Sequence, residues 1–294
     1  MYLKGRLGLE SARVPHADRH GMMWLAYGNL SVRDGTLVFQ TAGFDGVPAG
    51  RYDIPFQVIS FLLLGPGTTV THDALRLMSR HHTGLFAVGE AGVRLYASLP
   101  KPPDESKRAR RHATLWGDER RRLDAVRRMY AWRLGELVPS ADIAVLRGIE
   151  GARAKETYRQ LAAQFGITWR GRRYDRENPL MTDMPNQAIN HAAVACYAAA
   201  AVAVNAVGCI PQLGFIHEDS GEAFNLDIAD LFRDSFTIPV AFQAVKSVNP
   251  SQPDTLERTV RKLASAELRK AKLISVMIDR IKELIDADDH DRLA

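Results

Sequence analysis

The sequence predicts an α+β protein: a small β-rich, β-sandwich-like N-terminal domain (residues 1–100), followed by a larger all-α C-terminal domain (residues 101–294). Three observations lead to this prediction. Short apolar runs with strand-like patterning fill the first hundred positions. A Lys-Pro-Pro-Asp segment at 101–104 has the composition of a linker. Apolar residues at helical spacing prevail after it.

Several segments of the N-terminal part have the pattern of strands. NLSVRDGTLVFQT contains two alternating runs joined by Asp34 and Gly35, a strong signal for a β-hairpin. The continuous apolar run FQVISFLLL ends at Gly65-Pro66-Gly67, and GLFAVGE and VRLYASL are two more short strands. Residues 71–82 have helical spacing, and Thr71 is the expected N-cap.

Residues 192–210, AAVACYAAAAVAVNAVGCI, have the length of a membrane span. They are mostly alanine, include Asn205 and lack leucine, and alanine drives membrane insertion far less than leucine does. We therefore expect no membrane association and a buried helix whose small side chains allow close packing. Gly208 and Pro211 mark its expected end.

Charge and cysteine content indicate the kind of partner and the cellular compartment. The net charge is +5, and residues 101–133 alone hold 11 Lys and Arg against 5 Asp and Glu. Concentrated positive charge favours a polyanionic partner, although a solvated helix face explains it as well. Cys196 and Cys209 form no CxxC pair, which favours a reducing cytoplasm and buried, inert thiols. The N-terminus shows no apolar signal core.

Acidic residues and a histidine form the first candidate site. Glu150 lies between Gly148 and Gly151, which predicts a turn at the entry to a helix, and the helix dipole alone would favour an acid there.

In GFIHEDSGEAFNLDIADLFRD, a helix is expected to start near Leu226, with Asp227 and Asp230 on one face and His217 at the mouth of the preceding loop. One imidazole with two carboxylates suits Mg²⁺ or Mn²⁺. Spacing of this kind is generic, and taken alone it favours an acid-rich helix N-terminus beside a buried histidine over a metal site.

A second candidate site is basic and aromatic. FGITWRGRRYDR places arginines around Trp169 and Tyr174. Guanidinium groups bind phosphates in a bidentate manner, and an aromatic ring can stack on an exposed base. The candidate nucleic-acid contacts in this segment are Arg170, Arg172, Arg173 and Tyr174.

Three motifs carry a family resemblance. RGIEGxRxKxTY, TWxGRRYD and GFIHxxxxxxFNLDIADLFR occur in this order. Together they resemble the universal CRISPR-associated adaptation protein, the first-numbered Cas protein, in its type I-E branch. PHADRHGMMWLAYGNLSVRDGTL resembles the N-terminal half of the same family, so the resemblance covers nearly the whole chain.

The resemblance implies that the helical domain is catalytic and holds Mg²⁺ or Mn²⁺. The family's metal ligands fall on Glu150, His217 and Asp227, and Asp230 matches a further acidic position needed for activity. The implied partners are a second copy of the chain in a homodimer, the small second-numbered Cas protein in a heterohexamer, prespacer duplex DNA and CRISPR leader–repeat DNA.

Some DNA contacts also follow from the resemblance. Tyr27 matches an aromatic residue that brackets the end of the prespacer duplex, and Arg94 matches a basic position near the DNA. Tyr174 and Arg233 match positions near the active site. Two positions depart from the family pattern: Leu226 is usually aromatic, and Arg233 replaces a common lysine.

The implied function is insertion of prespacer DNA into the CRISPR array by transesterification with a 3′-hydroxyl, together with endonuclease activity. His217 would bind the metal as a neutral imidazole, so activity should fall in acid. Two alternatives stay open from the residues: a stand-alone structure-specific nuclease acting on branched DNA, and a non-catalytic DNA-bridging subunit.

Overall fold

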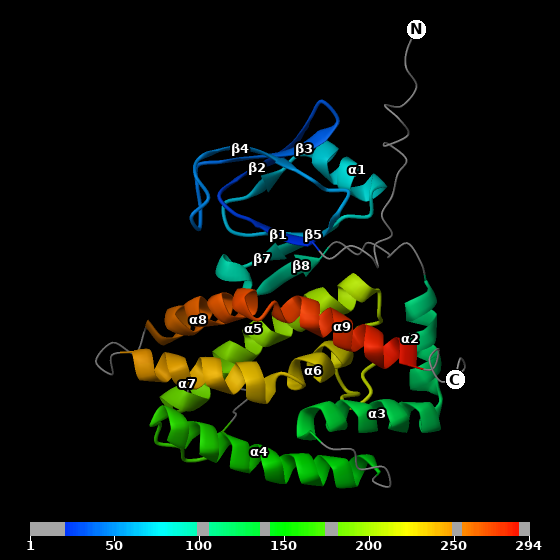
Figure 1. The fold of residues 1–294 in the computed structure, drawn as a ribbon, viewed down its shortest axis with the longest axis vertical. Helices are drawn as coiled ribbons and strands as arrows, with labels where there is room; N and C mark the ends of the chain where they lie inside the picture. Colours follow the sequence, from blue (N-terminus) through cyan, green and yellow to red (C-terminus); the bar gives the residue numbers. More distant parts are fainter. Residues whose placement is uncertain (1–20, 99–105, 136–141, 174–181, 249–254, 288–294) are drawn as a thin grey trace. The chain divides into compact units, whose positions relative to one another are not determined.

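The computed structural model describes residues 21–98, 106–135, 142–173, 182–248 and 255–287. The chain divides into two compact units, Met1–Gly89 with Tyr96–Ser106, and Glu90–Leu95 with Lys107–Ala294. The first unit is rich in strands and the second is helical, which confirms the predicted α+β class (Figure 1). Glu90–Leu95 belongs to the helical unit although it precedes residue 100. The expected linker at 101–104 lies outside the described residues.

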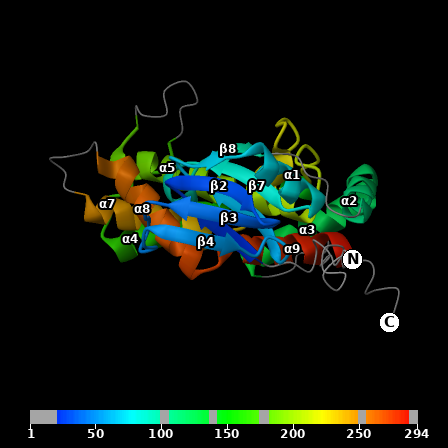
Figure 2. The same cartoon turned by 90° about the horizontal axis from the view of Figure 1, so that it is seen from above.

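The strand-rich unit contains two four-stranded sheets. One has the order β1-β5-β7-β8, and β1 and β5, like β5 and β7, pair in parallel. Its strands are β1 (Gly21–Leu25), β5 (Ile59–Leu64), β7 (Gly84–Val88) and β8 (Leu95–Ser98). The other sheet has the order β4-β3-β2-β6, and β2, β3 and β4 run side by side in Figure 2. Its strands are β2 (Gly28–Arg33), β3 (Thr36–Thr41), β4 (Gly50–Ile54) and β6 (Thr69–Val70).

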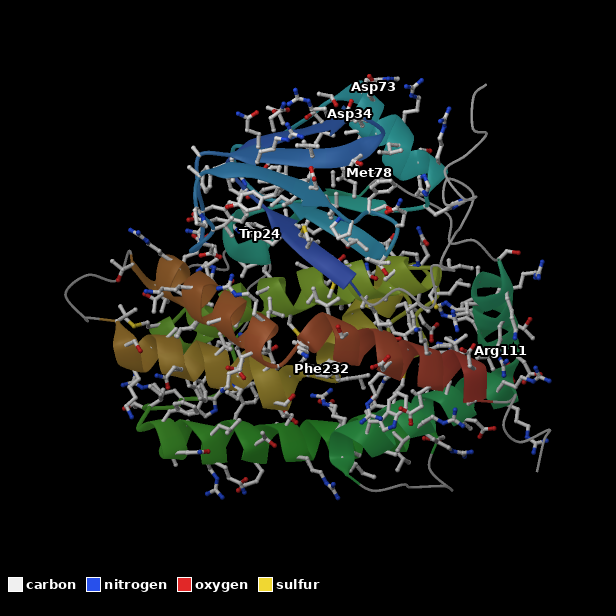
Figure 3. All side chains as sticks on the ribbon, turned by 45° about the horizontal axis from the view of Figure 1, so that its top comes forward. Trp24, Asp34, Asp73, Met78, Arg111 and Phe232 are labelled. Atoms are coloured by element: carbon white, nitrogen blue, oxygen red, sulfur yellow. The ribbon has the colours of Figure 1, made fainter. Side chains whose placement is uncertain are left out.

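The predicted hairpin and its neighbouring helix are confirmed. β2 and β3 pair antiparallel across Asp34 and Gly35, whose φ angles of 51° and 76° are those of a two-residue turn with positive φ at both positions. Asp34 and Met78 are labelled in Figure 3. Helix α1 (His72–Arg80) begins after Thr71, whose hydroxyl oxygen accepts from the Ala74 amide at 3.3 Å. Met78 on α1 is buried in the core of this unit.

The helical unit is built around one long buried helix. Its elements are α2 (Lys107–Gly117), α3 (Glu119–Leu134), α4 (Ile143–Phe165), α5 (Met184–Val207), α6 (Ala223–Asp230), the π-helical turn η4 (Arg233–Thr237), α7 (Ile238–Ser247), α8 (Leu256–Lys270) and α9 (Leu273–Asp286). Helix α5 contacts α6, α7, α8 and α9. The short η3 (Glu90–Gly92) also belongs to this unit.

Helix α5 is the apolar segment whose burial the sequence predicted. It is long and apolar enough to cross a membrane by length and composition, yet 67% of its most apolar window is buried inside the protein. Ala192 and Ala203 are fully buried, so their small side chains let the surrounding helices approach closely. The helix ends at Gly208, which adopts a left-handed φ of 77°. Burial raises the pKa of the Cys196 thiol to about 12, so this cysteine stays protonated.

Two helix boundaries differ from the expectation. Glu150 lies inside α4, not at its entry, because α4 begins after Asp142, whose side chain accepts from the Val145 amide at 2.8 Å. Gly148 and Gly151 are tolerated inside the helix, since each costs only about 1 kcal/mol relative to alanine. Helix α6 begins at Ala223, three residues before the expected start.

Candidate active site

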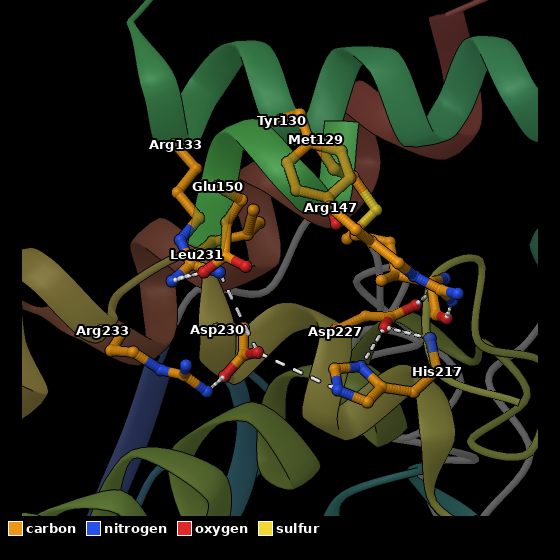
Figure 4. A pocket seen from close by; sticks show the side chains of 11 residues that line it. Met129, Tyr130, Arg133, Arg147, Glu150, His217, Asp227, Asp230, Leu231 and Arg233 are labelled. Carbon is orange, nitrogen blue, oxygen red and sulfur yellow. Dashed lines mark hydrogen bonds and ion pairs between the residues drawn. The ribbon is translucent and has the colours of Figure 1, made fainter. Parts of the chain in front are cut away.

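A cavity of about 370 Å³ in the helical unit brings the predicted acidic residues and histidine together (Figure 4). Glu150 comes from α4, His217 from the loop before α6, and Asp227 and Asp230 from α6. The cavity is lined by Met129, Tyr130, Arg133, Arg147, Glu150, Ile216, His217, Asp227, Asp230, Leu231 and Arg233. Segments that are distant in the sequence therefore converge on one site.

Asp227 is the buried anchor of this site. Its side chain is 0% exposed, and its carboxylate accepts four hydrogen bonds. Oδ2 accepts from the amides of Phe215 and Ile216 at 2.6 and 3.0 Å. Oδ1 accepts from the His217 amide at 3.0 Å and from its ring Nδ1 at 2.7 Å. Through these hydrogen bonds, the Asp227 carboxylate holds the loop that carries His217.

The contact with Asp227 fixes which ring nitrogen of His217 is available. A carboxylate only accepts, so Nδ1 carries the hydrogen, and the lone pair of the neutral ring lies on Nε2. Nε2 lies 3.9 Å from Asp230 Oδ2. The hydrogen bond to Asp227 raises the pKa of His217, and the charges of Asp227 and Asp230 raise it further, while burial opposes them. A buried carboxylate that orients a histidine in this way is common behind metal-binding imidazoles.

Two arginines neutralise the remaining carboxylates. Arg133 Nη2 lies 2.6 Å from Glu150 Oε1, and Nη1 lies 4.0 Å from Asp230 Oδ2. The Arg133 side chain is only 9% exposed, and Nη2 makes no hydrogen bond within the described part of the chain, so its contact with Glu150 is an ion pair. Arg233 donates to Asp230 Oδ1 at 2.5 Å.

The donor set suits a hard divalent cation. Carboxylate oxygens from two helices and one imidazole nitrogen line the cavity, and these are ligands that Mg²⁺ and Mn²⁺ accept. Across the described ranges, no three His, Cys, Asp or Glu side chains are grouped closely enough to hold a metal. The Arg133 guanidinium reaches both Glu150 and Asp230, so a positive charge already lies where a metal would meet their oxygens.

Most of the predicted DNA contacts lie away from the cavity lining. Among those of the predicted contacts that the structure describes, Arg233 alone lines the cavity. Arg94 pairs with Glu257, and Arg172 donates to the side-chain oxygens of Asn186 and Asn190 at 3.0 and 2.6 Å.

Arg170 and Arg173 are exposed. Tyr27, in the strand-rich unit, is 47% exposed with a φ of 53°. Tyr174 lies outside the described residues.

Sequence reasoning missed Arg133 and Arg147 as cavity residues. A signal for Arg133 was present: Val126, Met129 and Tyr130 form the buried face of α3, and Arg133 follows at the same helical spacing. An arginine on an apolar helix face needs an acidic partner, which here is the partly buried Glu150.

His112 on α2 makes the stability of this unit sensitive to acid. Its Nδ1 accepts from the Ile210 amide at 3.2 Å, and its Nε2 donates to the Leu213 carbonyl at 2.8 Å, so the ring is neutral. Burial lowers the pKa of His112 to about 4. The His112 imidazole is therefore protonated below about pH 6.5 in the unfolded chain, but only below about pH 4 in the folded chain.

We expect His112 to cost about 3 kcal/mol of stability as the pH falls from about 6.5 to about 4. Thermal unfolding of the wild type and His112→Gln between pH 7.5 and 4.5 measures this effect. The difference in melting temperature between the wild type and His112→Gln should become smaller as the pH falls. A difference that stays constant with pH would contradict the predicted role of His112.

Comparison with known proteins places the chain among CRISPR-associated proteins. The family described as CRISPR associated protein Cas1 matches residues 131–274. The CRISPR-associated endonuclease Cas1 of Escherichia coli (strain K12) is 37% identical over 277 residues, covering 94% of this chain and 88% of the relative. That of Geobacter sulfurreducens is 36% identical over 279 residues, covering 95% and 88%.

Solved structures agree. The crystal structure of a TtCas1–DNA complex has a TM-score of 0.81 at 29% identity, covering 91% of this chain and 97% of that chain. A casposase bound to integration product shares the fold at a TM-score of 0.59 and 16% identity, covering 91% and 96%. The fold and these levels of identity over most of the chain show that the protein belongs to the Cas1 family of CRISPR-associated endonucleases.

Proposed function

We propose that this protein is a divalent-metal-dependent integrase and endonuclease of CRISPR adaptation, which inserts prespacer DNA into a CRISPR array. The observation that carries the proposal is the convergence of Glu150, His217 and Asp230 in one cavity that arginines also line. The similarity to the Escherichia coli relative supports the type I-E branch. The buried thiols are compatible with a bacterial cytoplasm.

The geometry supports a division of labour among the four predicted residues. Glu150, His217 Nε2 and Asp230 face the cavity and would hold Mg²⁺ or Mn²⁺. Asp227 accepts four hydrogen bonds, so its part in the proposal is to orient His217 and its loop, and not to be a primary ligand as the resemblance implied. When bound, the ion would neutralise charge on the reacting phosphate and make the attacking hydroxyl a better nucleophile.

The proposed reaction is a transesterification. The 3′-oxygen of a prespacer strand forms a bond to phosphorus in the target strand, and the bond from phosphorus to the target's 3′-oxygen breaks. The hydroxyl proton is lost, and the departing oxygen gains one. Arg147 and Arg233 lie at the cavity and offer guanidinium donors to the phosphate oxygens. With water in place of the 3′-hydroxyl, the same site would cut DNA.

DNA and protein partners complete the proposal. The solved TtCas1–DNA complex supports DNA as the substrate. We propose a homodimer that joins the small second-numbered Cas protein in a heterohexamer and binds prespacer duplex and leader–repeat DNA. The proposed contacts beyond the cavity are Tyr27, Arg94, Arg170, Arg172, Arg173 and Tyr174, and binding through phosphates should weaken steeply with salt.

Replacing Arg133 with glutamine will tighten metal binding. The guanidinium competes with a cation for Glu150 and Asp230, so its removal lowers the electrostatic cost of binding. We expect the Mn²⁺ dissociation constant of Arg133→Gln to be about tenfold lower, which corresponds to about 1.4 kcal/mol. Calorimetric titration of the DNA-free protein measures this constant. Arg128→Gln, on the same helix, is the matched control, and weaker binding by Arg133→Gln would refute the competition.

A joining assay tests the function as a whole. Purified protein and its small partner are incubated with Mg²⁺, a labelled prespacer duplex and a supercoiled plasmid carrying a leader and repeat. The proposal predicts label covalently joined to the plasmid at the repeat boundaries. Cutting of branched DNA without the partner and without any joining would favour a stand-alone nuclease. Salt-sensitive binding with no metal-dependent reaction would favour a DNA-bridging subunit.

A further inference from the structure

The irregular segment that leads into His217 has each of its carbonyl groups bound by a side chain. Residues 213–216 lie outside any helix or strand. Their four carbonyl oxygens accept from His112 Nε2 (Leu213, 2.8 Å), Trp116 Nε1 (Gly214, 2.9 Å), Arg122 Nε and Nη2 (Phe215, 3.2 and 3.0 Å) and Arg147 Nη2 (Ile216, 2.6 Å). We call these four donors, His112, Trp116, Arg122 and Arg147, the carbonyl clamp.

The opposite groups of the same segment are bound as well. The amides of Phe215, Ile216 and His217 donate to Asp227. A helix or strand satisfies its backbone groups by repetition, whereas an irregular segment needs a separate partner for each one. The segment is therefore held between α6 on its amide side and α2, α3 and α4 on its carbonyl side.

Close packing leaves the segment little freedom to relax. Phe215 is fully buried, with its ring 5.2 Å from that of His112 and 5.7 Å from that of Phe224. A Cβ on Gly214 would overlap the carbonyl oxygen of His217 and the side chain of Ala223, so only glycine allows this approach. Fixed packing and directional hydrogen bonds together define one backbone path into His217.

The clamp also reaches the cavity and the residue beyond His217. Arg147 lines the cavity itself. Arg122 pairs with Glu218, the residue after His217, and its guanidinium lies 5.6 Å from the centre of the Trp116 ring. Trp116 is 36% exposed, yet its indole N–H donates to Gly214. The clamp residues thus contact the chain both before His217, at residues 213–216, and after it, at Glu218.

We propose that the carbonyl clamp is a positioning device that holds the His217 ring where it can bind the catalytic metal. This inference rests on the proposed function, because it assigns the clamp to the same metal site. None of the four residues needs to touch the ion, and they act through the backbone of residues 213–216. Loss of one donor should let this backbone move and misplace Nε2, which weakens metal binding.

Two conservative substitutions test the proposal. Trp116→Phe keeps an aromatic ring and removes the N–H donor. Arg122→Lys keeps the charge and replaces the two guanidinium donors to Phe215 with a single ammonium group on a different stem. The matched controls are Trp132→Phe, whose ring faces Arg280, and Arg120→Lys, which is exposed. Each protein is purified at full length, and Mn²⁺ binding without DNA is followed by electron paramagnetic resonance of the free ion.

The readouts separate positioning from simple stability. We expect Mn²⁺ to bind roughly fivefold more weakly to Trp116→Phe and to Arg122→Lys, and normally to both controls. Without metal, the amides of residues 215–217 should exchange hydrogen faster in the two clamp variants. A lower melting temperature with unchanged Mn²⁺ affinity would show a merely structural role and overturn the proposal. Failure of the wild type to bind Mn²⁺ would instead overturn the proposed function on which it rests.

Discussion

Asp230→Asn will lose at least about a thousandfold in the rate of metal-dependent strand joining, because it removes a carboxylate that faces the proposed metal site. The substitution keeps an oxygen that can accept from Arg233, which lies 2.5 Å from Asp230 Oδ1. Asp230 is partly exposed, so asparagine leaves no buried charge without a partner. The variant should therefore fold with a melting temperature close to that of the wild type.

The measurement pairs a joining assay in Mg²⁺ with thermal unfolding. Asp279→Asn, an exposed acid on α9, is the matched control and should join DNA at the wild-type rate. Joining by Asp230→Asn within tenfold of the wild type would exclude Asp230 from the metal site.

Asp227→Asn will abolish joining by a different route, and it will also destabilise the helical unit. The Asp227 carboxylate is 0% exposed, and each of its oxygens accepts two hydrogen bonds. An amide offers one oxygen and one NH₂ group, so in either orientation the NH₂ group faces donors from the loop. We expect the free energy of unfolding to fall by about 2–4 kcal/mol, which is typical when buried N–H donors lose their acceptor.

The two aspartates are distinguished by their melting temperatures. Asp227→Asn should unfold several degrees below the wild type, and Asp230→Asn should not. The amides of residues 215–217 should exchange hydrogen faster in Asp227→Asn than in the wild type, and at the wild-type rate in Asp230→Asn. Equal melting temperatures for the two variants would contradict the separate roles of these residues.

Local features of the fold could be predicted because short segments encode them. The Asp34-Gly35 turn requires positive φ angles that these residue types adopt readily, and the structure shows them. The alanine-rich composition of residues 192–210 predicted a buried helix, and α5 is the helix around which the second unit packs. In both cases the residues that determine the structure are neighbours in the sequence.

The site was harder to predict because its members meet through tertiary packing. Nothing in the spacing of Glu150 and His217 requires α4 to lie beside the loop before α6, so only the family motifs suggested that they act together. The glycines near Glu150 led to the wrong prediction that it lies at a turn. It lies inside α4, because the packing of a long helix outweighs the local cost of the glycines. Asp227 and Asp230 look alike in sequence, and only the hydrogen bonds show that one holds the loop and the other faces the cavity.

We propose that DNA joining depends on a divalent metal held at the cavity that Glu150 lines. The most direct measurement is the initial rate of prespacer joining as Mg²⁺ is titrated, for the wild type and for Glu150→Gln, with the small partner present. We expect a saturable, metal-dependent rate for the wild type that chelation abolishes, and no joining by Glu150→Gln at any Mg²⁺ concentration. Joining by Glu150→Gln at the wild-type rate, or joining that persists after chelation, would contradict it.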